Sequence, residues 1–486
     1  MKRDIAGLRS DRFDILVIGG GINGCAIARD AALRGAKVAL IEKNDFASGA
    51  SGKTTKLIHG GIRYLEQFNF KLVYEALHER QVLLKTAPQL VHPLEFIIPV
   101  YKDDPRSLLK MKTGVTIYDW MAGKDKLRCH RSLKKNELIS LEHNIDPVNL
   151  RGGVIYCDAQ MDDVRLCLDN AISAYEAGCC IANKVEAAGF IKEKERITGI
   201  QAQDLLTGEK LLISASIVVN ATGAWSNYTI RMDEPKARAI TRSTKGVHII
   251  YRKLPHERAI LLSNHKDKRI FFVIPWRNFT LIGTTDTDFF GSADEVYACA
   301  DEVEYLLDET RRIFPDENIG KKGIITTYAS LRPLVNTERT PAWQVSREHL
   351  IKESSAGLIS VVGGKYTTYR LLAEQVVDLV LTKFAGRHFK KCITASVGPS
   401  LLQQQRADFH DSVEEAVKDE MANNLIDLLA RRLQLSVTPS LGFDRLEECA
   451  SIMAGLLNWG LSQKESQISA YKEEIRKNTQ FSDNPC

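Results

Sequence analysis

The first forty residues contain two short apolar runs separated by a helical pattern. Residues 13–18 are apolar except for one aspartate, and this run, which is too short for a helix and ends in three glycines, is typical of a buried strand. Residues 22–33 carry apolar side chains at helical spacing, and Gly35 is a suitable helix stop. Residues 37–41 form a second short run, apolar after Lys37, which ends at Glu42. The pattern predicts a strand, a crossover helix and a parallel strand.

Later segments show the same two kinds of pattern. Strands are predicted for residues 153–156, 213–220, 271–275, 280–283 and 357–362. Helices are predicted for residues 71–86, 163–177, 303–313 and 367–382. The strands between residues 240 and 285 follow each other without room for crossover helices, so we expect them to form an antiparallel sheet.

The order of these patterns predicts an α/β fold with three parts. A Rossmann-like domain is expected from residues 1–90, 150–235 and 350–390, and an inserted domain with an antiparallel sheet from residues 91–149 and 236–349. Residues 391–486 are expected to form a helical C-terminal domain, because apolar residues there recur at helical spacing, as at positions 413, 417, 421, 425, 428 and 429.

Composition excludes several classes of protein. A chain of 486 residues with 44% apolar and 26% charged residues fits a globular protein of several domains and excludes collagen-like, coiled-coil and disordered chains. No run of eighteen apolar residues and no signal-type N-terminus occurs, so no spanning helix is expected. The net charge of +5 is too small to indicate nucleic-acid binding unless it is concentrated on one face.

Metal binding is also disfavoured. The ten cysteines show no CxxC and no ordered spacing, which argues against structural zinc and iron–sulfur ligands. The run that begins at Asp286 starts like a calcium-binding EF-hand loop. However, Phe290 and Tyr297 stand where that loop requires oxygen ligands. No metal site is expected.

The densest basic stretch follows an apolar and aromatic segment. Residues 124–135 carry six basic residues against one aspartate, and residues 108–121 include Trp120 and Met121. An apolar wedge beside a basic strip suits an anionic bilayer surface. A solvated loop beside buried core gives the same pattern, so both interpretations stay open.

The glycine run between the first strand and helix carries the first chemical signal. Gly19, Gly21 and Gly24 satisfy GxGxxG, and Glu42 closes the second strand eighteen residues later. Such glycines permit a tight turn, a close approach of backbone to a pyrophosphate and close packing of helix on strand. A carboxylate at this place accepts the ribose hydroxyls, which favours FAD or NAD.

Two further segments favour FAD and carry a family resemblance. Residues 220–225, which read NATGAW after a predicted strand, resemble the second fingerprint of FAD-dependent oxidoreductases. Residues 54–66 read TTKLIHGGIRYLE and closely resemble the signature of the FAD-dependent glycerol-3-phosphate dehydrogenases. These are respiratory enzymes of the D-amino-acid-oxidase-like flavoprotein group.

Other stretches extend this resemblance over roughly residues 10 to 435. They are residues 245–249, 272–276, 282–286, 331–334 and 363–370, and also residues 420–422 with Arg431 and Arg432, which are expected on one helix. Gly52 and Tyr366 depart from the family pattern, and the last fifty residues match it weakly. The resemblance implies that the Rossmann-like domain binds FAD and that the inserted domain is a substrate-binding cap.

The resemblance also implies a set of site residues. The expected cofactor-binding residues are Gly19, Gly21, Ile22, Asn23, Gly24, Glu42, Ser51, Thr54, Thr55, Lys56, Leu57, Val185, Ala221, Thr222, Gly223, Trp225, Gly364, Lys365 and Thr367. Arg63, Arg332 and Lys365 would surround a substrate phosphate, with Tyr64 as a further donor. Several cations are what a dianion in a partly dry pocket requires.

Two histidines are candidates for the base that removes the proton of the substrate hydroxyl. Imidazole can act as a base near neutral pH, and His59 and His248 both lie in family-like segments. His59 is favoured because glycines follow it in the loop expected beside the flavin, but a role in hydrogen bonding alone remains an alternative. Trp276 and Phe272 are expected to be core.

The resemblance implies oxidation of sn-glycerol 3-phosphate to dihydroxyacetone phosphate, with hydride transfer from C2 to flavin N5. Electrons would pass to a membrane quinone, which implies a cytoplasmic protein bound peripherally to the inner face of the cell membrane. A homodimer is compatible with the sequence. The alternatives are an oxidase that uses oxygen, an amine or amino-acid oxidase on the same fold, and a flavoprotein without activity.

Overall fold

The computed structural model describes residues 1–265, 267–336, 349–399 and 408–481. The chain begins with the predicted unit of strand β1 (Arg12–Ile18), helix α2 (Ile22–Leu33) and strand β2 (Val38–Glu42). The two strands pair in parallel, with Ile15 opposite Val38. Five of the seven residues of β1 are apolar and buried, so the run can only lie in the interior of a sheet.

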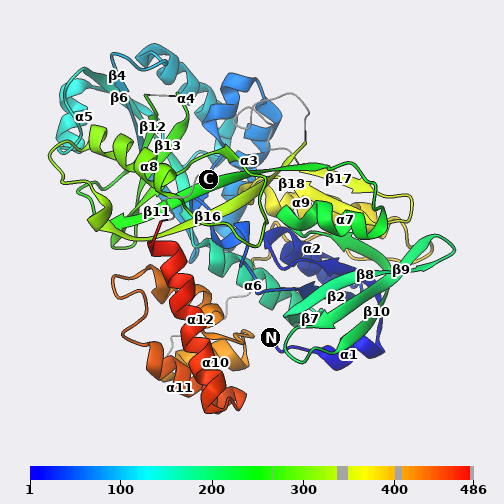
Figure 1. Cartoon of the computed structure of the whole chain (residues 1–486). Helices are drawn as coiled ribbons and strands as arrows, with labels where there is room; N and C mark the ends of the chain where they lie inside the picture. Colours follow the sequence, from blue (N-terminus) through cyan, green and yellow to red (C-terminus); the bar gives the residue numbers. More distant parts are fainter. Residues whose placement is uncertain (266, 337–348, 400–407, 482–486) are drawn as a thin grey trace.

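This unit is the centre of an eight-stranded sheet (Figure 1). The strands run in the order β17-β18-β10-β1-β2-β7, and a hairpin of β8 and β9 extends from β10. The added strands are β7 (Cys180–Asn183), β8 (Val185–Glu193), β9 (Arg196–Asp204), β10 (Lys210–Asn220), β17 (His349–Glu353) and β18 (Ile359–Gly363). β18, β10, β1, β2 and β7 are parallel, so their carboxyl ends meet at one edge.

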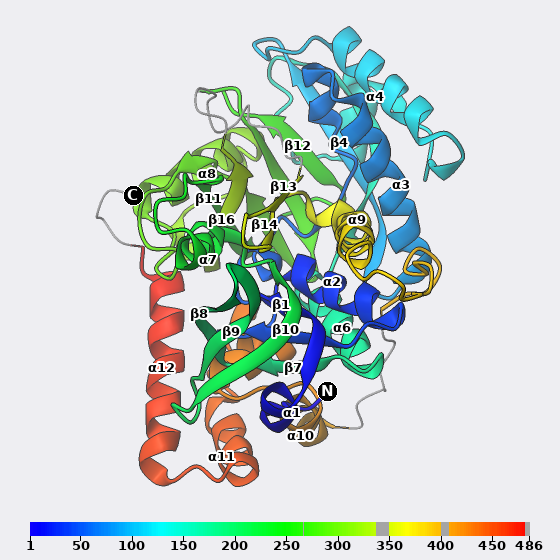
Figure 2. The same cartoon turned by 90° about the vertical axis from the view of Figure 1, so that its right-hand side faces the viewer.

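Helices cover one face of this sheet. α2, α6 (Asp163–Glu176) and α9 (Tyr369–Leu381) share an apolar core with the side chains of Ile15 and Val17. The other face packs on α1 (Ile5–Ser10) and on the hairpin of β8 and β9. Figure 2 shows α2, α6 and α9 gathered on the same side of β1 and β10.

A second sheet of ten strands forms the other large part of the molecule. Its order is β15-β11-β14-β13-β12-β4-β6-β3, with β16 beside β11 and β5 beside β6. Its strands are β3 (Leu57–Ile58), β4 (Val91–Tyr101), β5 (Arg131–Lys134), β6 (Leu150–Met161), β11 (Thr241–Arg252), β12 (Ala259–Ser263), β13 (Ile270–Trp276), β14 (Phe279–Gly283), β15 (Thr287–Asp288) and β16 (Ile324–Val335). The strands between residues 240 and 285 are antiparallel to each other, which confirms the prediction. β12 also pairs with β4, and in parallel.

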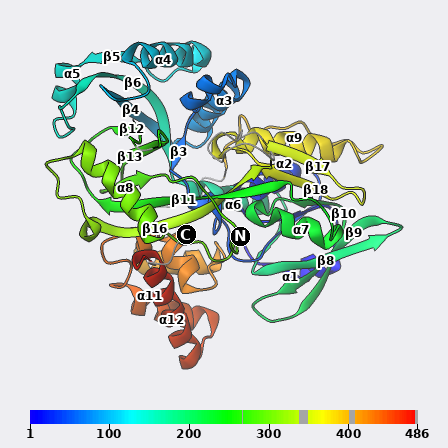
Figure 3. The same ribbon diagram turned by 45° about the horizontal axis from the view of Figure 1, so that its top comes forward.

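Several of the described helices pack on this sheet. They are α3 (Phe70–Thr86), α4 (Leu108–Ala122), α5 (Lys135–Leu141) and α8 (Ala300–Ile313). In Figure 3 α3 and α4 lie beside each other at one end of the molecule, and the two helices share an apolar core with β4 and β6. A short helix, α7 (Ser226–Asp233), follows the turn after β10.

The C-terminal residues form a separate helical group, as the spacing of apolar residues predicts. It consists of α10 (Phe409–Lys418), a π-helical segment η8 (Asp427–Arg432), α11 (Leu446–Leu457) and α12 (Leu461–Thr479). Glu420 and Arg432 are not on one helix, contrary to expectation, because α10 ends at Lys418 and the chain turns before η8 begins. α12 contacts the second sheet through a bond from the Thr327 hydroxyl to the Asn478 carbonyl oxygen, at 2.8 Å.

The predicted elements are present, with different ends. The strand expected at residues 153–156 is the middle of the twelve-residue β6. β3 and β6 come from segments assigned to the first domain, yet they pair within the second sheet. The boundaries of the three predicted domains stay a prediction. Within the part of the chain that the structure describes, no helix is both long and apolar enough to cross a bilayer.

Candidate active site

The glycine turn lies where the carboxyl ends of β1 and β10 meet. Ile18 is opposite Asn220, so this turn faces the one that follows β10. Gly19 has a φ of +113°, and a Cβ there would stand 2.6 Å from the carbonyl oxygen of Ala221. A Cβ on Gly24 would overlap the carbonyl oxygen of Gly19. These glycines let two turns and the first turn of α2 approach each other, as the fingerprint predicts.

Glu42 is the last residue of β2 and lies beside the glycine turn. Its Oε2 accepts a hydrogen bond from the Gly20 backbone N–H at 2.6 Å, and its Oε1 accepts one from the Asn44 N–H at 2.7 Å. Burial raises the pKa of Glu42, although these two N–H groups oppose the shift. The carboxylate is therefore held in place beside the glycine turn and faces the cavity described next.

A cavity of about 500 Å³ runs from this corner to the second sheet. It is lined by most of the residues expected to bind cofactor or substrate: Gly19, Gly21, Ile22, Asn23, Glu42, Ser51, Thr54, Thr55, Leu57, His59, Arg63, Tyr64, Val185, Ala221, Thr222, Gly223, Trp225, His248, Arg332, Gly364, Lys365 and Thr367. Residues from distant parts of the sequence thus share one cavity between the two sheets.

Two of the expected residues do not line this cavity. Gly24 lies behind the turn, where it permits close packing of α2. The side chain of Lys56 is buried and pairs with Asp163 at 2.5 Å. Its Nζ also lies 5.0 Å from the centroid of the Trp276 ring. Lys56 therefore stabilises the segment of residues 54–66 from the side that does not line the cavity.

The turn at Gly60 is held by a buried network. The Gly60 N–H donates to the Tyr118 hydroxyl at 2.8 Å, and this hydroxyl donates to Asp158. Arg80 pairs with the same carboxylate at 2.6 Å, and Arg80 and Asp158 are each about 1% exposed. A Cβ on Gly60 would meet the Tyr118 hydroxyl, so glycine is required there. The network fixes the backbone between His59 and Arg63.

Three of the expected phosphate-binding groups lie together. Lys365 Nζ stands 3.9 Å from the centroid of the Tyr64 ring, and the Arg63 guanidinium carbon stands 5.2 Å from it. Lys365 Nζ also donates to the Gly60 carbonyl oxygen at 3.3 Å. Two cations therefore lie close to one tyrosine ring in the cavity wall.

Arg332 lies on β16 of the second sheet, and three neighbouring groups hold its guanidinium in place. Its Nη2 donates to the Thr284 hydroxyl at 2.6 Å, and its Nη1 donates to the Thr285 carbonyl oxygen at 3.0 Å. Asp286 pairs with it at 3.2 Å. A Cβ on Gly246 would overlap the guanidinium, so this glycine leaves the space in which Arg332 lies.

The two histidines differ in their environments. His248 is 1% exposed, its Nε2 lies 2.9 Å from the Thr55 hydroxyl, and its ring stacks on Tyr328 at 5.0 Å. Burial, together with the charges of Arg332 and Lys56, holds the pKa of His248 well below its usual value. The backbone of His59 exchanges hydrogen bonds with the Thr367 hydroxyl.

Several cavity residues were not predicted as site residues. Phe272, which was expected to be core, lines the cavity, together with other apolar side chains: Phe96, Tyr156, Leu261 and Ile270. Thr284 and Asp286, the anchors of Arg332, lie in a family-like segment that could have indicated them. Arg269, which donates to the Asp286 carbonyl oxygen at 2.6 Å, has no such signal.

The site has a glycine turn at a helix N-terminus, a buried carboxylate beside it and a second turn opposite. These features fit the adenosine diphosphate half of FAD. Comparisons with known proteins agree with this fit. Residues 14–370 match the model of the family described as FAD dependent oxidoreductase. The chain belongs to this family, and its cofactor is FAD.

Similar proteins with known names indicate a narrower group within this family. A glycerol-3-phosphate dehydrogenase of Synechocystis sp. is 35% identical, and the match covers 98% of each chain. An aerobic glycerol-3-phosphate dehydrogenase of Staphylococcus haemolyticus is 34% identical over 88% of this chain and 78% of its own. The crystal structure of the glycerol-3-phosphate dehydrogenase from Bacillus halodurans, complexed with FAD, has a TM-score of 0.81 at 24% identity and covers 98% of this chain and 97% of its own. The family resemblance read from the sequence is confirmed.

Proposed function

We propose that the protein oxidises sn-glycerol 3-phosphate to dihydroxyacetone phosphate. The observation that carries this proposal is the cationic cluster of Arg63 and Lys365 around Tyr64, in the same cavity as the FAD-binding turns. The names of the relatives support the same substrate.

Charge explains why this cluster suits a phosphate ester. A phosphate dianion loses hydration when it enters the cavity, and it needs charged donors in return. Arg63 and Lys365 supply two positive charges, and the Tyr64 hydroxyl supplies a further donor. Arg332 shares its positive charge with Asp286, so it neutralises less of the dianion and serves better to orient the substrate.

We infer that His248 accepts the proton of the C2 hydroxyl. Its depressed pKa keeps the imidazole neutral, so a lone pair is free to take a proton. The hydrogen bond to Thr55 and the stacked Tyr328 ring hold it in one orientation. A bound dianion would raise the pKa of His248 by its negative charge, which makes the histidine a stronger base when substrate is present. FAD, when bound, supplies the acceptor for the hydride that leaves C2.

The electron acceptor proposed is a membrane quinone, reached from a lipid-facing surface. We define the aromatic surface as Phe68, Phe70 and Tyr74, beside and in α3, with Leu109, Ile117 and Trp120 of α4. All six side chains are exposed, Trp120 and Phe68 at 80% each. The six basic residues between 124 and 135 are exposed as well. An exposed apolar surface beside cations suits an anionic bilayer.

Only part of the predicted apolar segment belongs to this surface. Met111, Val115 and Tyr118 are buried in the core, so only the exposed face of α4 is available for the proposed bilayer contact. Phe68 follows Tyr64 by four residues, which puts the aromatic surface next to the proposed substrate site along the chain.

Flavin bleaching tests the proposal. The purified protein under nitrogen should lose its visible flavin absorbance when glycerol 3-phosphate is added, and glycerol or glycine should have no such effect. Bleaching by glycine instead would support an amino-acid oxidase. Stoichiometric peroxide on admission of air, without need of a quinone, would support the oxidase alternative.

A further inference from the structure

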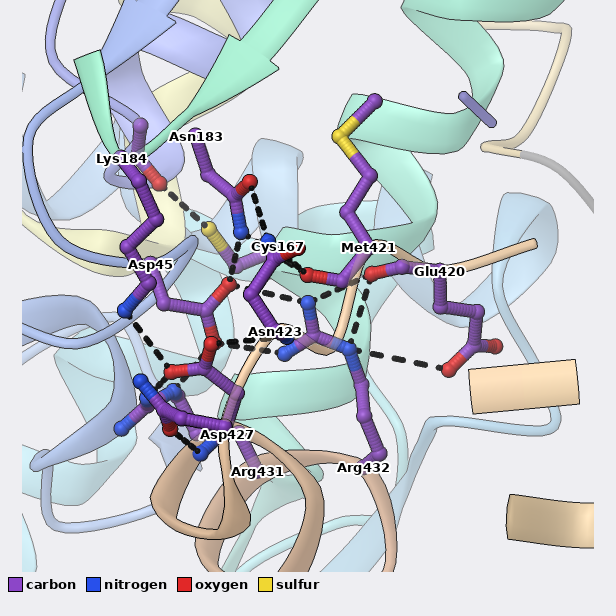
Figure 4. Close-up of polar contacts among 12 residues, drawn as sticks. Asp45, Cys167, Asn183, Lys184, Glu420, Met421, Asn423, Asp427, Arg431 and Arg432 are labelled. Atoms are coloured by element: carbon purple, nitrogen blue, oxygen red, sulfur yellow. Dashed lines mark hydrogen bonds and ion pairs between the residues drawn. The ribbon is translucent and has the colours of Figure 1, made fainter. Parts of the chain in front are cut away.

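A buried cluster of charged groups joins the C-terminal helices to the end of β2. The residues involved are Asp45, Asn183, Lys184, Asp427, Arg431 and Arg432. Figure 4 shows the side chains of Arg431 and Arg432 directed at this cluster from η8. Its members come from three distant segments of the chain, so only the tertiary structure brings them together.

Asp45 is at the centre of the cluster. Arg432 donates to both of its carboxylate oxygens, at 2.6 and 2.9 Å, and Arg431 donates to Oδ2 at 2.5 Å. Asn183 adds a fourth bond at 3.0 Å. The side chains of Asp45 and Arg432 are both 0% exposed. Although burial alone would raise it, the Arg432 and Arg431 guanidiniums hold the pKa of Asp45 well below its usual value.

The carboxylate of Asp45 belongs to the loop that follows Glu42. Glu42 and Asn183 are opposite each other in the parallel pair of β2 and β7, so the same strand ends carry the Glu42 carboxylate and a partner of Asp45. The Asn44 N–H bonds to Glu42, and the Lys184 N–H donates to the Asn44 carbonyl oxygen. Residues 42–45 all line the cavity.

The arginines are themselves fixed. Arg431 also pairs with Asp427, and Arg432 donates to the Glu420 carbonyl oxygen at 2.6 Å. η8 is a π-helical segment, a rare geometry that is frequent at functional sites. Arg431 also lies within electrostatic reach of Lys53, another residue of the cavity wall. The C-terminal group therefore contacts the cavity wall through Asp45.

We propose that Arg431 and Arg432 are positioning residues for FAD, and that the C-terminal helices complete its adenosine site. By clamping Asp45, they hold the loop 42–45 so that Glu42 faces the ribose. The inference rests on the proposed role of Glu42 but not on the substrate. Buried charge pairs add little net stability but are costly to break, which is what a fixed loop requires.

The test measures nucleotide binding to the full-length apoprotein. Arg432→Gln, Arg431→Gln and Asp45→Asn should each weaken FAD and ADP by at least about tenfold in Kd, because ADP carries the adenosine half alone. Arg445→Gln is the matched control, since Arg445 lies in the same helical group and forms a surface ion pair with Glu448. The far-UV circular dichroism of each variant should match that of Arg445→Gln, whereas general misfolding would change it.

Glu42→Gln separates the role of Glu42 in the adenosine site from the role of the two arginines. If Glu42→Gln weakens ADP while the arginine variants bind it normally, the clamp is refuted and the adenosine site stands. If no variant weakens ADP, both fail. Hydrogen exchange of the wild type gives an answer even if the variants do not fold. ADP should protect both residues 42–45 and residues 427–432, and protection confined to the first segment would overturn the inference.

Discussion

At the scale of single residues, charge and burial divide the cavity into two functional regions. Arg63 and Lys365 both lie close to the Tyr64 ring, where we propose that the substrate phosphate binds. His248 is buried beside Arg332, where an imidazole stays neutral. Each of these regions supports its own prediction.

Lys365→Met removes one cation without removing the bulk of the side chain. We expect kcat/KM for glycerol 3-phosphate to fall at least about 10²-fold, about 3 kcal/mol, because a desolvated charge-assisted contact is lost. Unphosphorylated glycerol should lose far less. Lys383→Met is the matched control, since Lys383 forms a surface pair with Glu353. Equal losses for both substrates would mean that Lys365 does not bind the phosphate.

His248→Asn tests the proposed base through the pH dependence of kcat, which reports groups in the enzyme–substrate complex. In the wild type, kcat should fall at acid pH as His248 becomes protonated. The free enzyme should be able to keep His248 neutral below the ordinary histidine pKa, because its own pKa is lowered. The variant should lose that acid limb and about 10²-fold or more in kcat.

His59→Asn is the comparison for this experiment, because His59 lines the same cavity. It should retain the acid limb, with a smaller loss of rate. If the acid limb persists in His248→Asn and disappears in His59→Asn, the base is His59, as the sequence alone favoured.

At the scale of elements, the turn between β1 and α2 is constrained by contacts on all sides. The Ile22 N–H, the first of the helix, donates to the Ser51 hydroxyl at 2.9 Å, so a neighbouring loop reaches the helix N-terminus. Gly21, Ile22 and Asn23 at this helix end line the cavity, and the positive end of the helix dipole favours a pyrophosphate there.

Gly21→Val tests this element. A Cβ at Gly21 would stand 3.1 Å from the Ser51 hydroxyl oxygen, and the rest of the valine side chain would occupy the proposed path of the pyrophosphate. The variant should fold but purify with little FAD, as the ratio of flavin to protein absorbance measures. Gly455→Val is the control, because a Cβ there would have no neighbour within 4 Å among the described residues outside its own helix backbone. Full flavin content in Gly21→Val would remove the pyrophosphate from this turn.

At the scale of the whole molecule, α4, which carries part of the aromatic surface, lies far from the C-terminal helices (Figure 1). Figure 1 shows α4 at one end of the molecule and the C-terminal helices at the other. A protein that docks through α4 would therefore keep the C-terminal helices away from the bilayer.

Liposome sedimentation tests this orientation. Trp120→Ala combined with Phe68→Ala should reduce binding to anionic vesicles, and so should replacing Arg128, Arg131, Lys134 and Lys135 by Gln. High salt should weaken the wild type, since the attraction of exposed charges is screened. Dye-linked activity should persist in both variants. Leu461→Ala, at 83% exposed on α12, is the control. A loss confined to the control would move the docking surface to the C-terminal helices.

Sequence alone determined the features that depend on local spacing. The β1-α2-β2 unit, the glycine turn and the antiparallel order of the strands between residues 240 and 285 follow from short-range patterns, because each states which face is buried and where the chain must turn. The expected site residues that follow β1, β2, β10 and β18 line one cavity because the carboxyl ends of parallel strands meet at one edge.

Only the tertiary structure decided the features that depend on distant partners. The direction of Lys56, the parallel pairing of β12 with β4, and the clamp on Asp45 each require residues far apart in the chain. No local pattern predicts them, because a lysine or an aspartate is expected to be exposed to solvent unless a buried partner for it is known. Burial in the folded chain makes such charges costly unless they are paired, and it was this pairing that assigned the C-terminal helices a place beside the cofactor site.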